Sequence, residues 1–306
     1  MKYFPLTLII ILYSLNSFCQ SYDGHITDAT FLYNQKKYDK SSQKWDNAFT
    51  IHKGYSSDYY NAACTNALAG NKDKAFEYLE KAIKSGWNDI EWMKNDRDLI
   101  SLKDSKRWTL FIKNISSLKT EYLSSLNIKM KDRLEELRMQ DQTIRLLLPD
   151  AEKRFSRNSK EYSWFRNELM PRNDSIVLTE IVDIINNNGW LGINEVGELA
   201  NQTLWLVIQH APLSIQEEYL PLLKKSVEKG DSKARYLAFL QDRILMRKNE
   251  KQIYGTQSMW SSKREKNVIW PIENAESVNE RRKNVGLESI EEYADNNGFV
   301  YEPENK

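Results

Sequence analysis

The sequence predicts a mainly helical protein, with antiparallel helix pairs in its N-terminal part and a C-terminal helical domain that carries a small two-stranded β ribbon. Three patterns support this. Packing residues recur at a fixed spacing near the N-terminus, apolar residues elsewhere recur every three or four positions, and residues 252–257 alternate between polar and apolar types. The 306 residues are 41% hydrophobic and 28% charged, which suits two soluble domains with hydrophobic cores.

Residues 1–19 are expected to be a targeting segment and not part of the fold. Lys2 precedes an apolar run over residues 6–15, a length typical of a signal peptide and shorter than the about 20 residues that span a membrane. Small residues favour cleavage after Cys19. The alternative is a lipoprotein acylated at Cys19, although the bulky Phe18 fits that signal poorly. We therefore expect an exported protein, periplasmic or secreted.

Charge and motifs exclude several classes of function. The 44 lysine and arginine residues nearly balance the 43 aspartate and glutamate residues, whereas a nucleic-acid binder usually carries a basic excess. After cleavage Cys64 is the only cysteine, so we expect a buried packing residue and no internal disulfide. The sequence contains no His-Glu-x-x-His, Cys-x-x-Cys, Walker-type or Gly-x-Gly-x-x-Gly motif. We expect no nucleic-acid partner, no transmembrane segment, no dedicated metal site and no cofactor.

The N-terminal region repeats with a period of 34 residues. Four residues recur at this spacing: Ala29, Ser41, Trp45 and Ala48 return as Ala63, Ala75, Leu79 and Ala82. This is the period of a tetratricopeptide repeat, in which small residues allow two antiparallel helices to pack closely. Residues 22–116 therefore resemble such an array, with two repeats and a degenerate capping unit. Residues 117–135 are expected to form a helical connector.

Two functions are open for these helix pairs. They act either as a spacer that supports the next domain or as a groove that binds an unknown protein or peptide partner. The sequence does not name that partner.

Four longer helices are expected in the C-terminal domain, residues 136–297, with two short helices over residues 276–293 that are broken at Gly286. A flexible tail over residues 298–306 follows. The first helix runs over residues 127–148 and ends at Pro149. A second helix is expected to begin at a cap formed by Asp174. The two most regular helices are expected over residues 198–210, which are apolar on nearly all sides, and over residues 233–247.

His210 is the main catalytic candidate. It lies at the C-terminal end of the most apolar helix, on the same face as Leu206 and Thr203, where the helix dipole favours its charged form. Histidine is the side chain best suited to act as a general acid or base near neutral pH. Asp242 is the candidate for orienting its ring. Arg243 is the candidate for holding an anionic or polar substrate.

Further polar residues near these positions are candidates for ligand binding. Residues 252–257 are expected to pair with residues 268–272 as the β ribbon, and Gly255 indicates either a bulge or a close approach of the backbone to a ligand. The complete set of ligand-binding candidates is Gln209, Gln241, Arg243, Gln252, Tyr254, Gly255, Thr256 and Gln257.

Several blocks of the C-terminal domain resemble one bacterial family of uncharacterised activity. The blocks that carry the resemblance are Trp205–Ala211, Leu240–Arg243, Gln252–Gln257 and Arg281–Leu287, with Gly189-Trp190 and Val196–Glu198 before them. The resemblance covers residues 137–293, including Asp141-Gln142 and Arg145, and it implies that the candidates above lie in family motifs. Members often carry an acidic residue after His-Ala, where this chain has Pro212.

Three interpretations of this domain stay open. It binds a small polar ligand without chemistry, it is a hydrolase-like or transferase-like enzyme that uses His210, or its polar residues are structural. The last interpretation has His210 capping its helix and Asp242 paired with Arg243. Arg281 and Arg282 either face solvent or turn inward to meet an acidic residue or a substrate.

Overall fold

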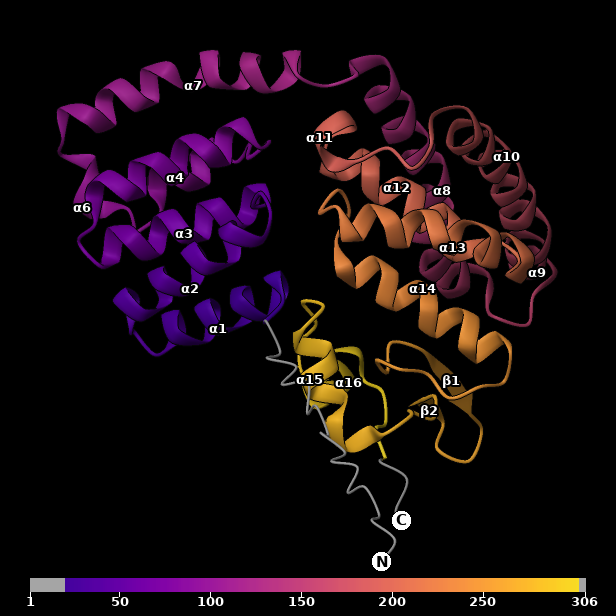
Figure 1. Cartoon of the computed structure of the whole chain (residues 1–306). Coiled ribbons are helices and arrows are strands. Elements are labelled where there is room, and N and C mark those ends of the chain that lie inside the picture. The colour runs from indigo at the N-terminus through magenta and orange to yellow at the C-terminus, as the bar shows by residue number, and fades with distance from the viewer. Residues whose placement is uncertain (1–19, 303–306) are drawn as a thin grey trace, which may run out of the picture.

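A computed structural model describes residues 20–302 of the chain (Figure 1). The expected signal peptide, with Cys19, and residues 303–306 of the expected tail lie outside the described residues. The protein is mainly helical with one two-stranded antiparallel sheet, which confirms the predicted fold class.

Antiparallel helix pairs build the N-terminal part. Helix α1 packs on α2, α3 packs on α4, α2 joins the two pairs through α3, and α7 covers α4. The bounds of these helices are α1 (Tyr22–Asn34), α2 (Tyr38–Ile51), α3 (Ser56–Leu68), α4 (Lys72–Lys84), α5 (Ile90–Asn95), α6 (Ile100–Lys103) and α7 (Lys106–Ser124).

The residues that recur every 34 positions lie in the core of these pairs. Ala29 and Ala63 are fully buried, and their small side chains let the paired helices approach. Trp45 and Leu79, at equivalent positions, fill the space between the crossings and are also buried. The Trp45 Nε1–H donates to Thr65 Oγ1 at 3.1 Å, so the only polar atom of this large side chain is satisfied.

Helix α7 passes along the top of the molecule and leads into the C-terminal part (Figure 1). It runs without interruption past residue 116, and the chain changes direction at residues 125–127 rather than within a continuous connector. The bounds of the following helices are α8 (Ile128–Phe155), α9 (Lys160–Trp164), η1 (Phe165–Leu169), α10 (Met170–Asn188), α11 (Ile193–Val196), α12 (Glu198–His210), α13 (Leu213–Glu228), α14 (Ala234–Arg247), η2 (Ala275–Ser277), α15 (Val278–Lys283) and α16 (Ile290–Asn297).

One expected helix end and one expected helix start differ in the structure. Pro149 lies inside α8, which continues to Phe155. A proline removes one backbone hydrogen bond, but the following turn is held by buried Ala151 and by the hydroxyl of Tyr162, which donates to Glu152 at 3.1 Å. Asp174 does not cap α10, because that helix already begins at Met170.

The β ribbon is shifted along the chain from its expected position. Strand β1 (Ser258–Ser261) pairs with β2 (Lys266–Ile269), with Ser258 opposite Ile269. Residues 252–257 form an irregular loop, which contributes one isolated parallel bridge between Gln252 and Ile272. The physical reason is that a buried carboxylate binds three backbone N–H groups of this loop, which are then unavailable to a strand partner.

The residues after Gly298, which were expected to be flexible, extend the ribbon instead. Ile269 N–H donates to Val300 O at 2.9 Å, and Val300 N–H donates to Asn267 O at 2.8 Å. Phe299 packs beside the small C-terminal core around Ile290. These contacts hold the chain as far as its last described residues.

The chain returns to its own first helix at the bottom of Figure 1, where α15 contacts α1. Ser21 Oγ donates to the carbonyl oxygen of Asn284 at 2.9 Å, and Lys283 forms an ion pair with Asp28. Asp23 lies close to Gly286, where an added Cβ would be 2.7 Å from the Asp23 Oδ1 atom. The two parts of the protein therefore contact each other both through α7 and through α1.

Asp23 makes the stability of this contact dependent on pH. Burial, followed by the charge of Asp58, raises the pKa of Asp23 to about 7 although Lys233 and Arg235 oppose the rise. An unfolded aspartate titrates near ~3.9. The folded protein therefore retains a proton that the unfolded chain has lost, and stability decreases as pH rises between these two values.

Asp23→Asn should remove this dependence. The full difference in pKa corresponds to about 4 kcal/mol, and water at the partly exposed side chain reduces it, so we expect a gain of about 1–2 kcal/mol near pH 8. Little change is expected near pH 4, where the aspartate is neutral in the folded state. Thermal unfolding of both proteins across this pH range measures the effect. Parallel pH profiles for the two proteins would contradict it.

Candidate functional site

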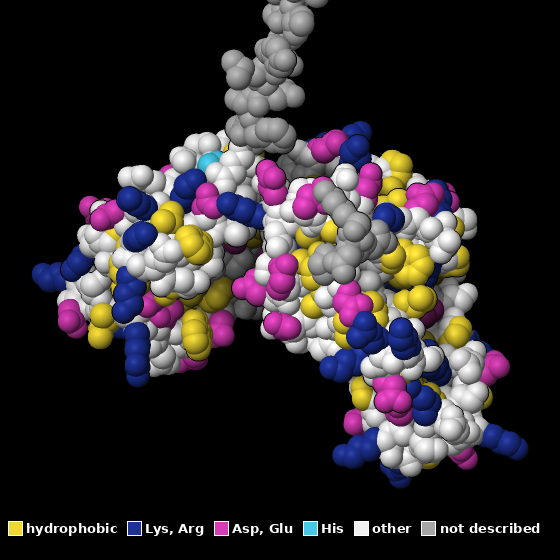
Figure 2. Space-filling model, turned by 90° about the horizontal axis from the view of Figure 1, so that it is seen from below, with side chains coloured by type: hydrophobic (Ala, Val, Ile, Leu, Met, Phe, Trp, Pro, Cys, Tyr) yellow, Lys and Arg dark blue, Asp and Glu magenta, His cyan; other side chains and the backbone are white. Residues whose placement is uncertain are grey.

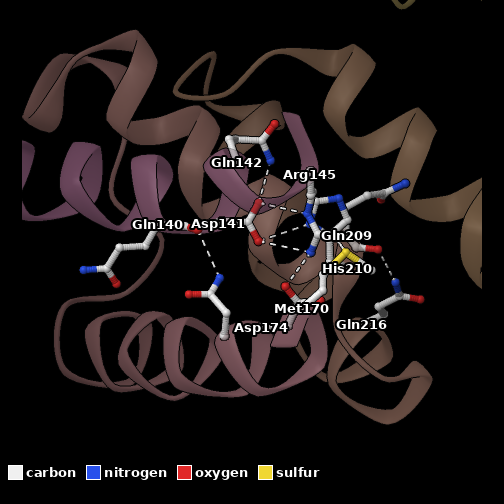
Figure 3. Close-up of polar contacts among 10 residues, drawn as sticks. Gln140, Asp141, Gln142, Arg145, Met170, Asp174, Gln209, His210 and Gln216 are labelled. Atoms are coloured by element: carbon white, nitrogen blue, oxygen red, sulfur yellow. Dashed lines mark hydrogen bonds and ion pairs between the residues drawn. The ribbon is translucent and has the colours of Figure 1, made fainter. Parts of the chain in front are cut away.

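His210 ends α12 with its ring directed toward α8, as Figure 3 shows. Its Nδ1 atom lies 3.3 Å from Oδ1 of Asp141, a carboxylate in the middle of α8. The Asp141 side chain is 1% exposed and the His210 side chain is 22% exposed. Packing of α8 against α12 brings the two residues together across 69 positions in sequence. The carboxylate that orients His210 is thus Asp141, whereas Asp242 has other partners.

Arg145 lies beside this pair, one helical turn after Asp141. Its Nη2 group donates to Asp174 Oδ1 at 2.7 Å and to Asp141 Oδ1 at 3.3 Å. The amide of Gln142 donates to the other oxygen of Asp141 at 2.5 Å. We refer to Asp141, Gln142, Arg145, Asp174 and His210 as the Asp141 cluster (Figure 3).

These contacts set the charge states of the cluster. Burial by itself raises the pKa of Asp141, but hydrogen bonds and charges from His210 and Arg145 outweigh it and hold that pKa below its usual range. Burial lowers the pKa of Arg145, and Asp141 and Asp174 more than reverse this change. An ionised Asp141 accepts the Nδ1–H of His210. The Nε2 atom of His210 makes no hydrogen bond to any residue between 20 and 302, so it is free for a ligand.

Arg243 and Arg247 bring positive charge to the same end of α12. Arg247 donates to the carbonyl oxygen of Ala211, directly after His210, at 2.5 Å. Arg243 lies one turn earlier on α14, and its Nε atom is buried without a hydrogen-bond partner within the described part of the chain. Burial lowers the pKa of Arg243 most, and the charges of Arg247 and Arg145 lower it further. No carboxylate among residues 20–302 forms an ion pair with Arg243.

Two buried glutamines leave acceptor atoms unused nearby. The Gln216 amide donates to Gln209 O at 2.8 Å, and the Gln209 amide donates to Phe239 O at 3.3 Å. The Oε1 atoms of Gln209 and Gln216 are buried without a partner in the described residues. Most buried polar atoms in folded proteins are hydrogen-bonded, so unpartnered atoms at one helix end mark this region as unusual.

Asp242 holds the loop of residues 252–257. Its carboxylate is fully buried and accepts hydrogen bonds from the backbone N–H groups of Ile253, Tyr254 and Thr256 at 2.8–3.1 Å. The Thr256 hydroxyl donates to the same carboxylate at 3.0 Å. Burial raises the pKa of Asp242 even though these donors oppose it. The structure thus places Asp242 in a loop-holding role.

Arg282 binds the same loop through a backbone carbonyl oxygen of the loop. Its side chain is fully buried, its Nη1 group donates to Tyr254 O at 2.7 Å, and its Nε–H donates to Glu288 O at 2.6 Å. Arg281 donates to Ile253 O at 2.9 Å. Both arginines therefore turn inward, but they meet backbone carbonyl oxygens and not an acidic side chain.

Several of the other residues predicted to bind a ligand also make their contacts within the fold. Gln252 is fully buried and bonds the backbone of Gln257 at both ends of its amide, with N···O distances of 3.0 and 2.9 Å. Gly255 has φ 73°, and an added Cβ would lie 2.6 Å from Ile290, so its close neighbour is a core side chain. Gln241 is partly exposed on α14. Gln209 directly precedes His210 on α12, and Arg243 lies on α14 one turn before Arg247.

A family of unknown function, DUF6624, matches residues 140–301, more than half of the chain. The chain belongs to this family. The matched region begins one residue before Asp141 and contains both the Asp141 cluster and the loop held by Asp242. No curated protein matches the chain, and no solved structure matches it.

Sequence patterns predicted no site role for several residues of this DUF6624 region, and Asp174 was expected only as a helix cap. Asp141 and Arg145 lay within the resemblance, and their spacing of four residues placed them on one helix face. That spacing was the available signal for an ion pair. Asp174 and Gln216 carried no comparable signal, because their partners belong to other helices.

One group of possible metal ligands lies outside the DUF6624 region. Among residues 20–302, the ligand atoms of Cys64, Asp96 and Asp98 lie within 4.8 Å of one another. Cys64 is buried, as expected, and its Sγ atom lies 3.6 Å from Asp96 Oδ2. A thiolate with two carboxylates is a donor set that binds zinc or similar ions.

Residues 20–302 contain no helix that could span a membrane. None of the helices in this range combines the length and the apolar composition needed to cross a bilayer.

Proposed function

We propose that this protein is an exported binding protein whose DUF6624 region takes up a small anionic ligand beside His210. The observation that carries the proposal is Arg243, a half-buried guanidinium that has no carboxylate partner in the described residues and lies close enough to Arg145 and Arg247 to interact electrostatically with them. Burying an unpaired charge is costly, so a protein that keeps one usually binds a group of opposite sign there.

The ligand class follows from the donors. Arg243 offers a planar guanidinium that matches the oxygens of a carboxylate or a phosphate. The Nε2 atom of His210 offers a second donor or acceptor, because Asp141 occupies Nδ1. A small carboxylate or phosphate would therefore satisfy two groups that have no partner within residues 20–302.

Arg243→Met tests this function by separating binding from stability. Thermal unfolding should be followed with inorganic phosphate, citrate and a panel of metabolites and peptidoglycan fragments. A ligand at a hundred times its Kd stabilises the folded state by about 2.7 kcal/mol, which raises Tm by roughly 5–10 °C in a protein of this size. We expect this rise for the unmodified chain and not for Arg243→Met or His210→Ala.

The ligand-free melting temperature provides a second readout. Arg243→Met removes an unpaired buried charge, so its Tm without ligand should be unchanged or higher. Arg172→Met, at an exposed arginine of α10, is the matched control and should respond to ligand like the unmodified chain. A lower ligand-free Tm for Arg243→Met, with no ligand response in any protein, would reject the proposal.

Catalysis is the second candidate, favoured by the hydrogen bond between Asp141 and His210. A buried carboxylate that holds one imidazole nitrogen leaves the other as a general acid or base in a hydrolase-like or transferase-like reaction. If a ligand from the panel is turned over, His210→Ala should retain affinity for it and lose turnover. Pro212 replaces the acidic residue that other members often carry, so a mechanism that needs that carboxylate is not proposed.

The helix pairs of the N-terminal part are proposed to bind a protein or peptide partner. Support comes from the 34-residue period and from the burial of the repeated residues, which together resemble a tetratricopeptide array. Such arrays present extended grooves along the first helix of each pair.

A further inference from the structure

A cavity of about 420 Å³ lies between α1, α3 and the segment that follows α5. Aromatic side chains from four elements line it: Tyr33 from α1, Trp45 from α2, Tyr60 from α3 and Trp92 from α5. Tyr60 stacks on Trp87 with a centroid distance of 4.0 Å, so its position is well fixed. Trp92 is 60% exposed, an unusual exposure for so large an apolar surface.

Two carboxylates complete the cavity. The Tyr60 hydroxyl donates to Asp96 at 2.7 Å, and the Tyr33 hydroxyl donates to Asp98. Among residues 20–302, no lysine, arginine or histidine forms an ion pair with Asp96 or Asp98. Lys103 donates to the backbone carbonyl oxygen of Asp96 at 2.7 Å and not to its carboxylate. Two negative charges therefore share one cavity without a positive partner from the described chain.

A second cavity of about 500 Å³ lies beside the first. Both include Thr30 and Asn34 of α1 in their linings. The lining of the second cavity includes Glu288 and Glu292 besides Lys233 and Arg235, whereas burial raises the pKa of Asp23 to about 7 and also raises the pKa of Asp58. Figure 2 shows acidic side chains along the border of the hollow between the two parts of the molecule. Within residues 20–302, Asp96 and Asp98 therefore carry the charge that no basic residue in either lining balances.

We propose that the cavity around Trp92 binds the side chain of a lysine or arginine from a basic, extended segment of a partner protein. Aromatic faces attract such cations within about 6 Å of the ring centroid, and a nearby carboxylate strengthens this attraction in a partly desolvated site. The basic side chain would supply the charge that Asp96 and Asp98 lack. This inference rests on the proposed partner-binding function of the helix pairs and gives that partner its chemistry.

The shape of the site favours an organic cation over a metal ion. The possible metal ligands Cys64, Asp96 and Asp98 line this cavity, but its volume of about 420 Å³ is far larger than a bare ion, and much of the remaining lining is aromatic. One oxygen of each carboxylate already accepts a tyrosine hydroxyl. A lysine or arginine side chain uses both the charge and the apolar walls.

The test uses calorimetry to measure the binding of a blocked pentapeptide, with one central lysine, to the full chain. The same peptide with norleucine has the apolar stem without the charge. We expect the lysine peptide to bind at least ten times more tightly than the norleucine peptide. We also expect Trp92→Ala and Asp98→Asn each to weaken it at least ten-fold, with an affinity that falls as salt is added. Arginine in place of lysine should also bind.

Matched controls separate a local effect from general charge or misfolding. Asp73→Asn removes an exposed carboxylate of α4 outside the cavity lining, and Trp260→Ala removes an exposed tryptophan of β1. Both should bind the lysine peptide like the unmodified chain. Trp92 is largely exposed, so Trp92→Ala should fold. This variant keeps the inference testable even if Asp98→Asn fails to fold.

Three results would overturn the inference. The first is equal binding of the lysine and norleucine peptides. The second is unchanged binding by Trp92→Ala. The third is tight binding of Zn²⁺ alone that is lost in Cys64→Ser and that excludes the peptide. Arg243→Met should still bind the lysine peptide and Asp98→Asn should still respond to the anion panel, so failure at one site is distinguishable from failure at the other.

Discussion

Asp242→Asn is expected to lower the free energy of unfolding by about 3 kcal/mol, because it removes a charged acceptor that binds three backbone N–H groups and one hydroxyl. An asparagine has one acceptor oxygen, and its amide N–H groups would face other donors. Relief of the buried charge offsets part of the loss, since burial already raises the pKa of Asp242. For a protein of this size the expected decrease in Tm is roughly 6–12 °C.

Thermal and urea unfolding measure this effect, and Asp183→Asn is the control at an exposed carboxylate of α10. If Asp242 held only the loop, the destabilised protein should still show the anion response proposed for Arg243 and His210. Loss of that response at a temperature where Asp242→Asn remains folded would instead show that Asp242 contributes to ligand binding.

Arg282→Met should destabilise the protein by a similar amount, about 3 kcal/mol. Methionine keeps much of the apolar stem but leaves the carbonyl oxygens of Tyr254 and Glu288 without their donors. It also removes the positive charge that partly compensates the buried Asp242. The unpartnered Nη2 atom of Arg282 limits the loss, because that group gains nothing from burial.

Arg264→Met in the turn of the ribbon is the control, since that arginine is exposed and its one ion pair within residues 20–302 is with exposed Glu302. Equal melting temperatures for Arg282→Met and the unmodified chain would show that the loop does not depend on this side chain. Asp242 and Arg282 act on the same loop, so the double variant should lose less stability than the two single losses added together.

Asp242 and Arg282 explain why residues 252–257, which were predicted to bind a ligand, have a structural role. Residues 252–257 direct their N–H groups to Asp242 and a carbonyl oxygen to Arg282, so their polar atoms are used within the fold. A dense polar motif indicates that hydrogen bonds must be made, but it does not say whether the partner is a ligand or the chain. His210 and Arg243 are different, because within residues 20–302 neither the Nε2 atom of His210 nor the Nε atom of Arg243 bonds to another part of the fold.

The spacing of apolar residues predicted the helices well where these residues are the ones that pack into the core. Helix α12 begins and ends at the predicted residues, and α14 differs by one residue at its start. The pattern failed at Pro149, where contacts from Tyr162 and Ala151 outweighed the loss of one backbone hydrogen bond. It failed again in the ribbon, because the alternation of residues 252–257 did not reveal that a distant carboxylate would bind their N–H groups.

The sequence by itself determined the helical class of this protein, the 34-residue packing of its first helices and the position of His210 at the end of its most apolar helix. These features depend on residues that are close in sequence, where periodicity reports directly which face is buried. Only the tertiary structure decided that Asp141 orients His210, that Asp242 and Arg282 hold one loop, and that Asp96 and Asp98 share a cavity with Trp92. Asp141 and His210, for example, meet because α8 packs on α12, and a contact across 69 residues depends on how whole helices fit together.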